Sequence, residues 1–268
     1  MSDPKMSHPR RKKLLPLLSV GVLLAAPLNA GADDSGISDR WQYAASIYLW
    51  GAGIDATTAR GADVNVSFET LINNLNMAFM GNFEARRDKW SMLADVVYLK
   101  VGANNSGKIP VAVAPGTNVD VKVDASVETK GLVLNVIGGY TLWQTPEASL
   151  DLLAGARYLN VQLDFGLGAA VGPNVRARTF SASGSIWDGV IGVKGHADLN
   201  PKWYLSYYLD VGTGQSNLTW QASAGLAYRF NWGDVSLLYR HIKWDLDSGS
   251  PLDNISFSGP LLAAKFLF

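Results

Sequence analysis

Residues 258–268 read SGPLLAAKFLF, and their apolar side chains recur with a period of two. One face of the strand that this period predicts carries Pro260, Leu262, Ala264, Phe266 and Phe268. Successive side chains of a β-strand point to opposite faces, so this strand has one wholly apolar face that runs to the last residue. Strands that are apolar on their outer face are typical of barrels in membranes. The remaining chain is therefore expected to supply the partner strands of such a barrel.

The composition suits a single all-β body. Hydrophobic residues make up 48% of the chain and charged residues 17%, and glycine occurs 27 times. There is no Cys, which excludes disulfides, thiolate nucleophiles and Cys-ligated metals. The three histidines (His8, His196 and His241) leave little for a His-based site. We expect neither a metal nor another cofactor.

The N-terminus has the pattern of a secretory signal peptide. Five basic residues precede an apolar run at positions 14–26: Lys5, Arg10, Arg11, Lys12 and Lys13. The run is too short to cross a bilayer as a helix, and the small residues at positions 30–32 fit a cleavage site. We expect residues 1–32 to be the signal peptide and residues 33–268 the barrel. Cleavage after Ala30 and a buried N-terminal helix are the alternatives.

Cleavage would leave a mildly acidic protein. It removes five of 23 basic and one of 23 acidic side chains, so the net charge falls from zero to −4. A chain of this charge is a poor partner for nucleic acid. No later segment approaches the ~20 apolar residues of a membrane helix, so any spanning segments must be strands.

Ten segments alternate between apolar and polar side chains, as spanning strands of ~10 residues do. They are residues 41–55, 76–87, 89–101, 132–142, 150–158, 187–194, 203–210, 218–229, 235–240 and 258–268. Short and longer connections largely alternate, and residues 109–123 and 169–180 look like hairpins that continue above the membrane. The pattern predicts an all-β fold, a single antiparallel up-and-down transmembrane β-barrel of ten strands, with eight or twelve as alternatives.

The tryptophans fall into two groups along these segments. The group near the short turns contains Trp41, Trp90, Trp143, Trp203 and Trp232. The group toward the opposite ends contains Trp50, Trp187, Trp220 and Trp244. Because indole prefers the membrane interface, we expect two aromatic belts. The alternative, a soluble β-sandwich, would bury its tryptophans centrally.

The inner face collects charged residues of both signs. The candidate ion-pairing residues are Glu84, Arg86, Asp95, Arg157, Asp188, Asp210, Arg229 and Arg240, together with Asp151, Lys194 and Lys265. Near balance of charge in a small barrel favours ion pairs that fill the interior. We expect Arg157 to pair with Asp188, and Arg86 or Arg240 to lie between Glu84 and Asp95. A selectivity filter for a small solute is the alternative.

A short amphipathic helix is expected over residues 68–75. Its apolar positions have the spacing i, i+3, i+4, i+7 after Ser67 as N-cap: Phe68, Leu71, Ile72 and Leu75. We interpret this helix as a lid at the mouth of the barrel.

Catalytic chemistry has weak support in the sequence. His241 with Asp245 and Asp247 is the one usable constellation, and His196 is near a different end of the barrel. No neighbouring serine offers the spacing of a nucleophile, so we expect no enzyme. The acidic residues of this loop, Asp253 included, fit solvation, Ca²⁺ or the divalent ions that bridge lipopolysaccharide.

Four segments resemble a family of proteobacterial outer-membrane barrel proteins with no established activity: YLWGAGID (48–55), FETLINNLNMAFMGNFEARR (68–87), SNLTWQASAGLAYRF (216–230) and SGPLLAAKFLF (258–268). The aromatic end with Phe266 and Phe268 is similar to the final strand that the barrel-assembly machinery recognises. The resemblance implies the outer membrane of a Gram-negative bacterium, with lipids and lipopolysaccharide as surroundings. It brings no catalytic residues.

These observations lead to one expected function and two alternatives. We expect a monomeric barrel with a largely closed, ion-paired lumen and a structural or surface-binding role. A narrow, porin-like channel for small solutes is the first alternative. An outer-membrane enzyme that acts on lipid or peptide is the second.

Overall fold

Twelve strands and one short helix make up the described part of the chain. The computed structural model describes residues 39–268 except 60, 115–116, 172–173, 248–249 and 251. The expected signal peptide lies outside the described residues. The elements are β1 (Gln42–Trp50), β2 (Gly53–Thr58), β3 (Asp63–Val66), α1 (Phe68–Asn73), β4 (Leu75–Arg87), β5 (Trp90–Ala114), β6 (Thr117–Gln144), β7 (Ala148–Val171), β8 (Asn174–Asp198), β9 (Trp203–Gly214), β10 (Leu218–Phe230), β11 (Gly233–Asp245) and β12 (Leu252–Leu267).

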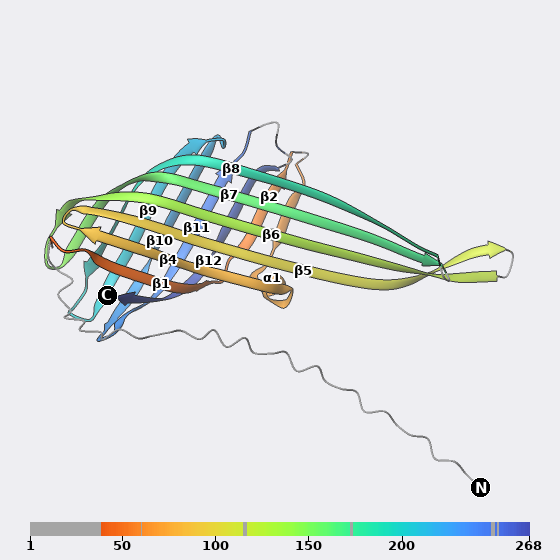
Figure 1. Ribbon diagram of the computed structural model, residues 1–268, viewed down its shortest axis with the longest axis horizontal. Helices are drawn as coiled ribbons and strands as arrows, with labels where there is room; N and C mark the ends of the chain where they lie inside the picture. The colour runs from red at the N-terminus through yellow and green to blue at the C-terminus, as the bar shows by residue number, and fades with distance from the viewer. Residues whose placement is uncertain (1–38, 60, 115–116, 172–173, 248–249, 251) are drawn as a thin grey trace, which may run out of the picture.

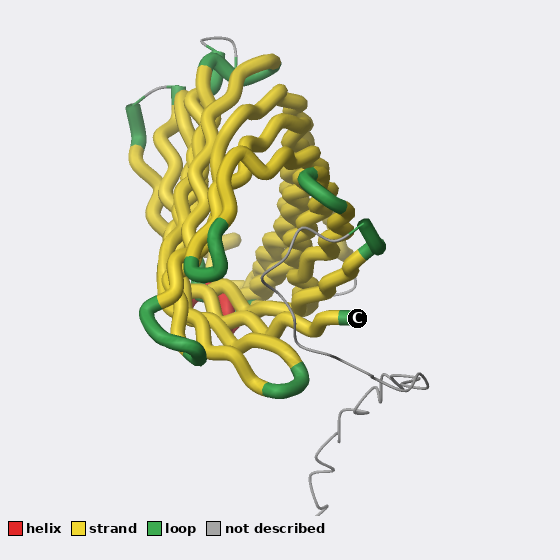
Figure 2. Tube along the Cα trace, turned by 90° about the vertical axis from the view of Figure 1, so that its left-hand side faces the viewer, coloured by secondary structure: helices red, strands yellow, loops and turns green. Residues whose placement is uncertain are grey.

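Ten of these strands form a closed ring. Strands β4 to β12 follow one another as antiparallel neighbours, and β1 pairs with both β4 and β12. The ring is seen from its end in Figure 2. Strands β2 and β3 form a hairpin that pairs with residues 252–258 of β12, and they are not members of the ring. The prediction of an antiparallel up-and-down barrel of ten strands is confirmed.

The two ends of the barrel differ in their connections. At the end called here the turn end, residues 88–89, 145–147, 199–202 and 231–232 join neighbouring strands. At the opposite, loop end, β5 to β8 continue for 24 to 28 residues each, more than twice what a spanning strand needs. They project beyond the other strands as a four-stranded sheet, called here the extension (Figure 1).

The extension contains the two hairpins predicted above the membrane. Residues 109–123 and 169–180 belong to the strand pairs β5–β6 and β7–β8, which confirms those predictions. The residues at the two tips lie outside the described residues.

Period-two alternation sets the two faces of the wall as predicted. Outward apolar side chains are widely exposed, for example Leu49 at 73%, Ile191 at 64% and Leu237 at 60%. Their neighbours in sequence face the lumen and are buried, as Tyr48 and Val190 are. An outer surface of this kind requires a hydrocarbon surrounding, because burial in lipid removes the apolar area from water.

The tryptophans confirm one belt and correct the other. All five at the turn end are exposed outward, between 43% and 66%. At the loop end Trp187 is outward, but Trp50 and Trp244 are 5% and 0% exposed and face the lumen. The prediction of a second belt is wrong for Trp50 and Trp244. Each follows an outward-facing residue, and because side chains alternate along a strand, each tryptophan faces inward.

The short helix forms close to its predicted place. Ser67 is the N-cap, and its side-chain oxygen accepts a hydrogen bond from the Thr70 backbone amide at 3.2 Å. The helix ends at Asn73 instead of Leu75, because Asn74 leaves helical geometry and its side chain caps the Thr70 carbonyl at 2.8 Å.

Helix α1 lies beside the wall near the point where β1 ends. Leu71 is buried, the Phe68 ring lies beside Gly51, and Phe68 and Ile72 are exposed. Leu75 is exposed at the start of β4. No described helix is long and apolar enough to cross a membrane.

The facing of the strands predicts the effect of a charge on the outer wall. Ile191→Arg puts a cation at mid-height of the apolar band and is expected to lower the free energy of unfolding in lipid vesicles by about 2–4 kcal/mol. Ser183→Arg on the same face of β8, in the extension, is the control and should be close to neutral. Equal stability of both variants in denaturant titrations would contradict the assignment of Ile191 to the lipid-facing side of the wall.

Candidate functional site: the lumen of the barrel

The described lumen has three layers along the barrel axis. A polar cavity opens at the turn end, a hydrogen-bonded layer of charged residues crosses the middle, and an apolar cluster fills the loop end. Each layer is built from inward positions of different strands, which the barrel brings to the same height.

Arg157 of β7 is the centre of the middle layer and is fully buried. Its Nη2 donates to the Asp210 carboxylate of β9 at 2.5 Å, and its Nε donates to Asn135 Oδ1 of β6 at 2.8 Å. Its Nη1 donates to Thr219 Oγ1 of β10 at 3.0 Å. Three strands other than its own therefore hold the guanidinium, which a buried charge requires.

A second cation completes a ring of hydrogen bonds, called here the lumen ring. Arg240 Nη2 of β11 donates to Asp95 Oδ2 of β5 and to Gln221 Oε1 of β10, both at 2.9 Å. Gln221 also accepts from Arg157 at 3.4 Å, and Asn135 donates to Asp95 at 3.1 Å. The ring Arg157–Asn135–Asp95–Arg240–Gln221 thus closes on itself across the lumen. All five residues are at most 7% exposed.

Tyrosines of two further strands extend the lumen ring. The Tyr48 hydroxyl of β1 donates to Asp95 at 2.6 Å and accepts from Arg240 at 3.1 Å. The Tyr208 hydroxyl of β9 donates to Asp210 at 2.5 Å. Seven of the ten strands therefore contribute to one polar layer.

An apolar cluster lies directly on the loop side of this layer. Its buried members include Trp50, Val133, Leu159, Ile242 and Trp244. Two indole rings face the guanidinium groups: Arg240 lies 4.8 Å from the Trp50 ring centre and Arg157 lies 5.8 Å from that of Trp244. Such contacts are attractive because the ring faces carry negative charge, and the rings exclude water from the pairs.

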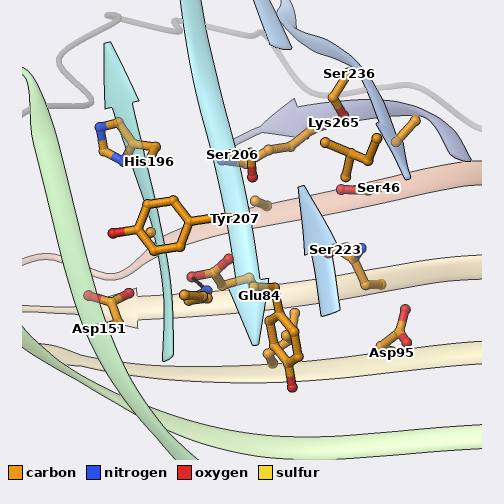
Figure 3. A pocket seen from close by; sticks show the side chains of 18 of the residues that line it. Ser46, Glu84, Asp95, Asp151, His196, Ser206, Tyr207, Ser223, Ser236 and Lys265 are labelled. Atoms are coloured by element: carbon orange, nitrogen blue, oxygen red, sulfur yellow. Dashed lines mark hydrogen bonds and ion pairs between the residues drawn. The ribbon is translucent and has the colours of Figure 1, made fainter. Parts of the chain in front are cut away.

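On the turn side the lumen widens into a cavity of about 310 Å³, called here the turn-end cavity (Figure 3). It reaches from rim residues such as Gln42 and Gln144 up to Arg240. Lys194 Nζ lies 2.6 Å from Glu84 Oε1, and Arg86 bridges Glu84 and Asp151. Its walls therefore carry ion pairs that water can reach.

The structure rearranges the expected pairs. Arg157 and Asp188 are cross-strand neighbours as expected, but Arg157 pairs with Asp210. Asp188 instead accepts two hydrogen bonds from Ser216, from its amide and its hydroxyl, both at 2.9 Å. The two side chains differ in length. The long Arg157 side chain can cross the lumen to Asp210, whereas the short Asp188 side chain stays near its own strand.

Glu84 and Asp95 also belong to separate groups. Glu84 lies in the turn-end cavity with Lys194 and Arg86, whereas Asp95 belongs to the lumen ring with Arg240. No single cation bridges the two acids in the described residues, and the expectation of one was wrong. Arg229 forms its pair with Asp198, through two hydrogen bonds of 2.7 Å.

Several residues of the lumen were not singled out from the sequence. Gln221 connects the two arginines, Asn135 links Arg157 to Asp95, and Thr219 accepts from Arg157. Asp198 and Asp234 are further inward acids. The period-two pattern already placed Tyr48 and Gln221 on the inner face. Their role as links could not be read from that pattern, because it needs the register between strands.

Two histidines contact serines, and they do so in different places. His241 Nδ1 lies 2.6 Å from Ser258 Oγ on the outer face of the wall, a contact that sequence spacing did not predict. His196 Nδ1 lies 2.8 Å from Ser149 Oγ in the turn-end cavity. Asp245, a member of the candidate constellation around His241, pairs with Lys243 at 2.9 Å.

The apolar band of the outer wall ends at a group of charges at the base of the extension. Lys100 and Lys130 lie 3.0 Å and 3.1 Å from the two oxygens of Glu128. Hydrogen bonds from Lys100 and then Lys130 hold the pKa of the Glu128 carboxyl below its ordinary value. These outward charges mark where the hydrocarbon surrounding has to end.

A closed antiparallel barrel with an apolar outer band, aromatic residues at its turn end and charges inside defines the class of transmembrane β-barrels. No protein-family model matches the chain, and no curated protein matches it. The features of the barrel itself therefore define the class of the protein.

Solved structures with a similar arrangement of strands are bacterial. The chain is similar to the outer-membrane protease OmpT of Escherichia coli (11% identity, 88% of this chain and 99% of that chain, TM-score 0.49). It is similar to the translocator domain of the autotransporter NalP of Neisseria meningitidis (14%, 88% and 90%, TM-score 0.43). It is also similar to the attachment invasion locus protein Ail of Yersinia pestis (10%, 85% and 98%, TM-score 0.32).

The lumen ring predicts a strong and non-additive response to mutation. Arg157→Ala strands the Asp210 carboxylate and is expected to cost about 3–5 kcal/mol of unfolding free energy. The double variant Arg157→Ala/Asp210→Ala should cost less than the sum of the single variants. Lys100→Ala, which removes a partly exposed pair with Glu128, is the control and should cost at most about 1 kcal/mol. Additive effects in denaturant titrations would show that the pair is solvated.

Proposed function

We propose that the protein is an integral barrel of the outer membrane of a Gram-negative bacterium, with a closed lumen and a structural or surface-binding role. One observation carries the proposal, namely the lumen ring with the apolar cluster packed on it. A hydrated path for a solute would need these side chains to part, which would leave buried charges without partners. The extension supports the surface-binding role, since strands of this length are not needed to span a membrane.

The outer-membrane location is supported by the chain's own features. The expected signal peptide directs export, the outer wall is apolar at mid-height, and the aromatic Phe266 and Phe268 are exposed at the turn end. In barrels of this class the short turns face the periplasm, so the extension is expected on the cell surface. Lipids and lipopolysaccharide would then surround the band, and the barrel-assembly machinery would insert the chain.

A narrow channel is the second candidate, and the turn-end cavity favours it. The cavity takes up the turn half of the lumen, where its charged walls would suit a small solute. The burial of the lumen ring argues against a channel. The turn-end cavity ends at Arg240 and the lumen ring, whose members are almost fully buried.

We propose no catalytic role. His196 lies between Ser149 and Asp198, but its Nε2 is 3.9 Å from a carboxylate whose two oxygens already accept from Arg229. That distance exceeds hydrogen-bond reach, so Asp198 does not orient His196 as the acid of a catalytic triad would. His241 and Ser258 lie on the outer wall, away from the lumen.

The proposed closed lumen predicts how well the protein conducts ions across a membrane. Wild-type protein in planar bilayers is expected to show no steady conductance. The triple variant Arg157→Ala/Trp50→Ala/Trp244→Ala, which removes the centre of the lumen ring and two indoles of its cover, should leak and serves as the positive control. Steady wild-type conductance that rises in proportion to salt would replace this proposal with the channel.

The orientation is testable with single cysteines, because the chain has none of its own. Ser183→Cys in the extension should react on intact cells with a maleimide too large to cross the outer membrane. Lys202→Cys, exposed at the turn end, should react only after the outer membrane is permeabilised. The reverse pattern would mean that the barrel is inserted the other way round, and labelling of neither would place it elsewhere.

A further inference from the structure

The turn-end cavity has the size of a site for a small ligand. Its 310 Å³ is at the lower limit of known ligand pockets. It opens toward the turn end and ends at the lumen ring, so it is a chamber with one entrance. A molecule of monosaccharide size would fill it.

The charge that faces this chamber is unequal. Five cationic side chains and three carboxylates line it. The cations are Arg86, Lys194, Arg229, Arg240 and Lys265, and the carboxylates are Glu84, Asp95 and Asp151. Two further acids, Asp198 and Asp234, do not line the cavity and lie behind their cations. With these two acids counted, five cations are balanced by five carboxylates, so an entering anion is attracted only where a cation is weakly paired.

Lys265 is the cation with the most capacity for another partner. Its side chain is 31% exposed, and its ammonium group lies 3.9 Å from the Asp234 carboxylate, the outer limit of an ion pair. Asp234 already accepts a hydrogen bond of 2.7 Å from the Tyr204 hydroxyl. The positive charge of Lys265 acts on Glu84 as well, so two lysines and Arg86 converge on this one carboxylate.

Neutral donors and acceptors complete the wall. Five serines line the chamber, together with Tyr207 and His196. The serines are Ser149 and the four labelled in Figure 3, Ser46, Ser206, Ser223 and Ser236. Hydroxyl groups both donate and accept, and they match the hydroxyl groups of a polyol better than they match an apolar ligand.

We propose that the turn-end cavity binds a small hydroxylated anion, a phosphate ester or a carboxylate of monosaccharide size, from the compartment at the turn end. Lys265 and Lys194 would contact the anionic group, and the serines would contact the hydroxyls. Because the lumen ring closes the chamber, the ligand would be held and released on the same side. Release on the same side rests on the closed lumen proposed above, whereas binding itself would occur in a closed or a conducting barrel.

Calorimetric titration of the purified, full mature protein in detergent tests the site. Glucose 6-phosphate and glucuronate are the two anionic probes, and neutral glucose is the matched control of the same size. At least one anion is expected to bind saturably, at least about tenfold more tightly than glucose, since charge-assisted hydrogen bonds contribute about that much. Binding of the phosphate alone or of the uronate alone identifies the anionic group. No saturable binding of either anion at millimolar concentration, or equal binding of glucose, overturns the proposal.

Two variants assign the binding to this cavity. Lys265→Gln should weaken the anion at least about tenfold, whereas Lys243→Gln, on the outer face of β11, should leave its affinity unchanged. Ser223→Asp places a negative charge in the wall and should also abolish binding, which keeps the test valid if Lys265→Gln fails to assemble. Unchanged affinity in an assembled Lys265→Gln or Ser223→Asp variant would refute the proposed site.

Discussion

A guanidinium group with no access to solvent, that of Arg157, is the constraint on which the barrel interior depends. Removing a charge from water is unfavourable by several kcal/mol unless partners replace the water. Those partners come from β6, β9 and β10, so the charge is satisfied only when these strands are closed into a ring at one register. The side chains that fix the register of these strands therefore also occupy the centre of the lumen.

Glycines allow the wall to curve around this layer. A side chain at Gly155 would have its Cβ 2.2 Å from the Val136 carbonyl oxygen, and one at Gly192 would have it 2.2 Å from that of Leu209. Both residues face inward, two positions from Arg157 and four from Asp188, so neighbouring backbones approach closely beside the middle layer of the lumen. Inward glycines of this kind are how strands bend at the corners of a barrel.

Period two in the sequence predicted which side chains face the lumen but not which of them meet. It placed Arg157, Asp188 and Asp210 inside, and all three are buried there. The pairing of Arg157 with Asp210 depends on the relative heights of β7 and β9, which follow from strand tilt and stagger over the whole ring. The same limit explains Trp244. Its distance from the short turns predicted a position at the membrane interface, whereas its place in the period-two alternation of β11 puts its side chain in the lumen.

The extension is stable as a sheet because four consecutive strands lengthen together. A single projecting hairpin would be marginal in water, whereas here β6 and β7 are paired on both sides along most of their length. Among the described pairings, β5 beyond Gly102 and β8 before Asp188 have a partner on one side only. These two edges carry backbone donors and acceptors that can pair with a strand of another chain. A surface-binding role would therefore have its chemistry in the backbone of the extension, separated by the lumen ring from the charged chamber at the turn end.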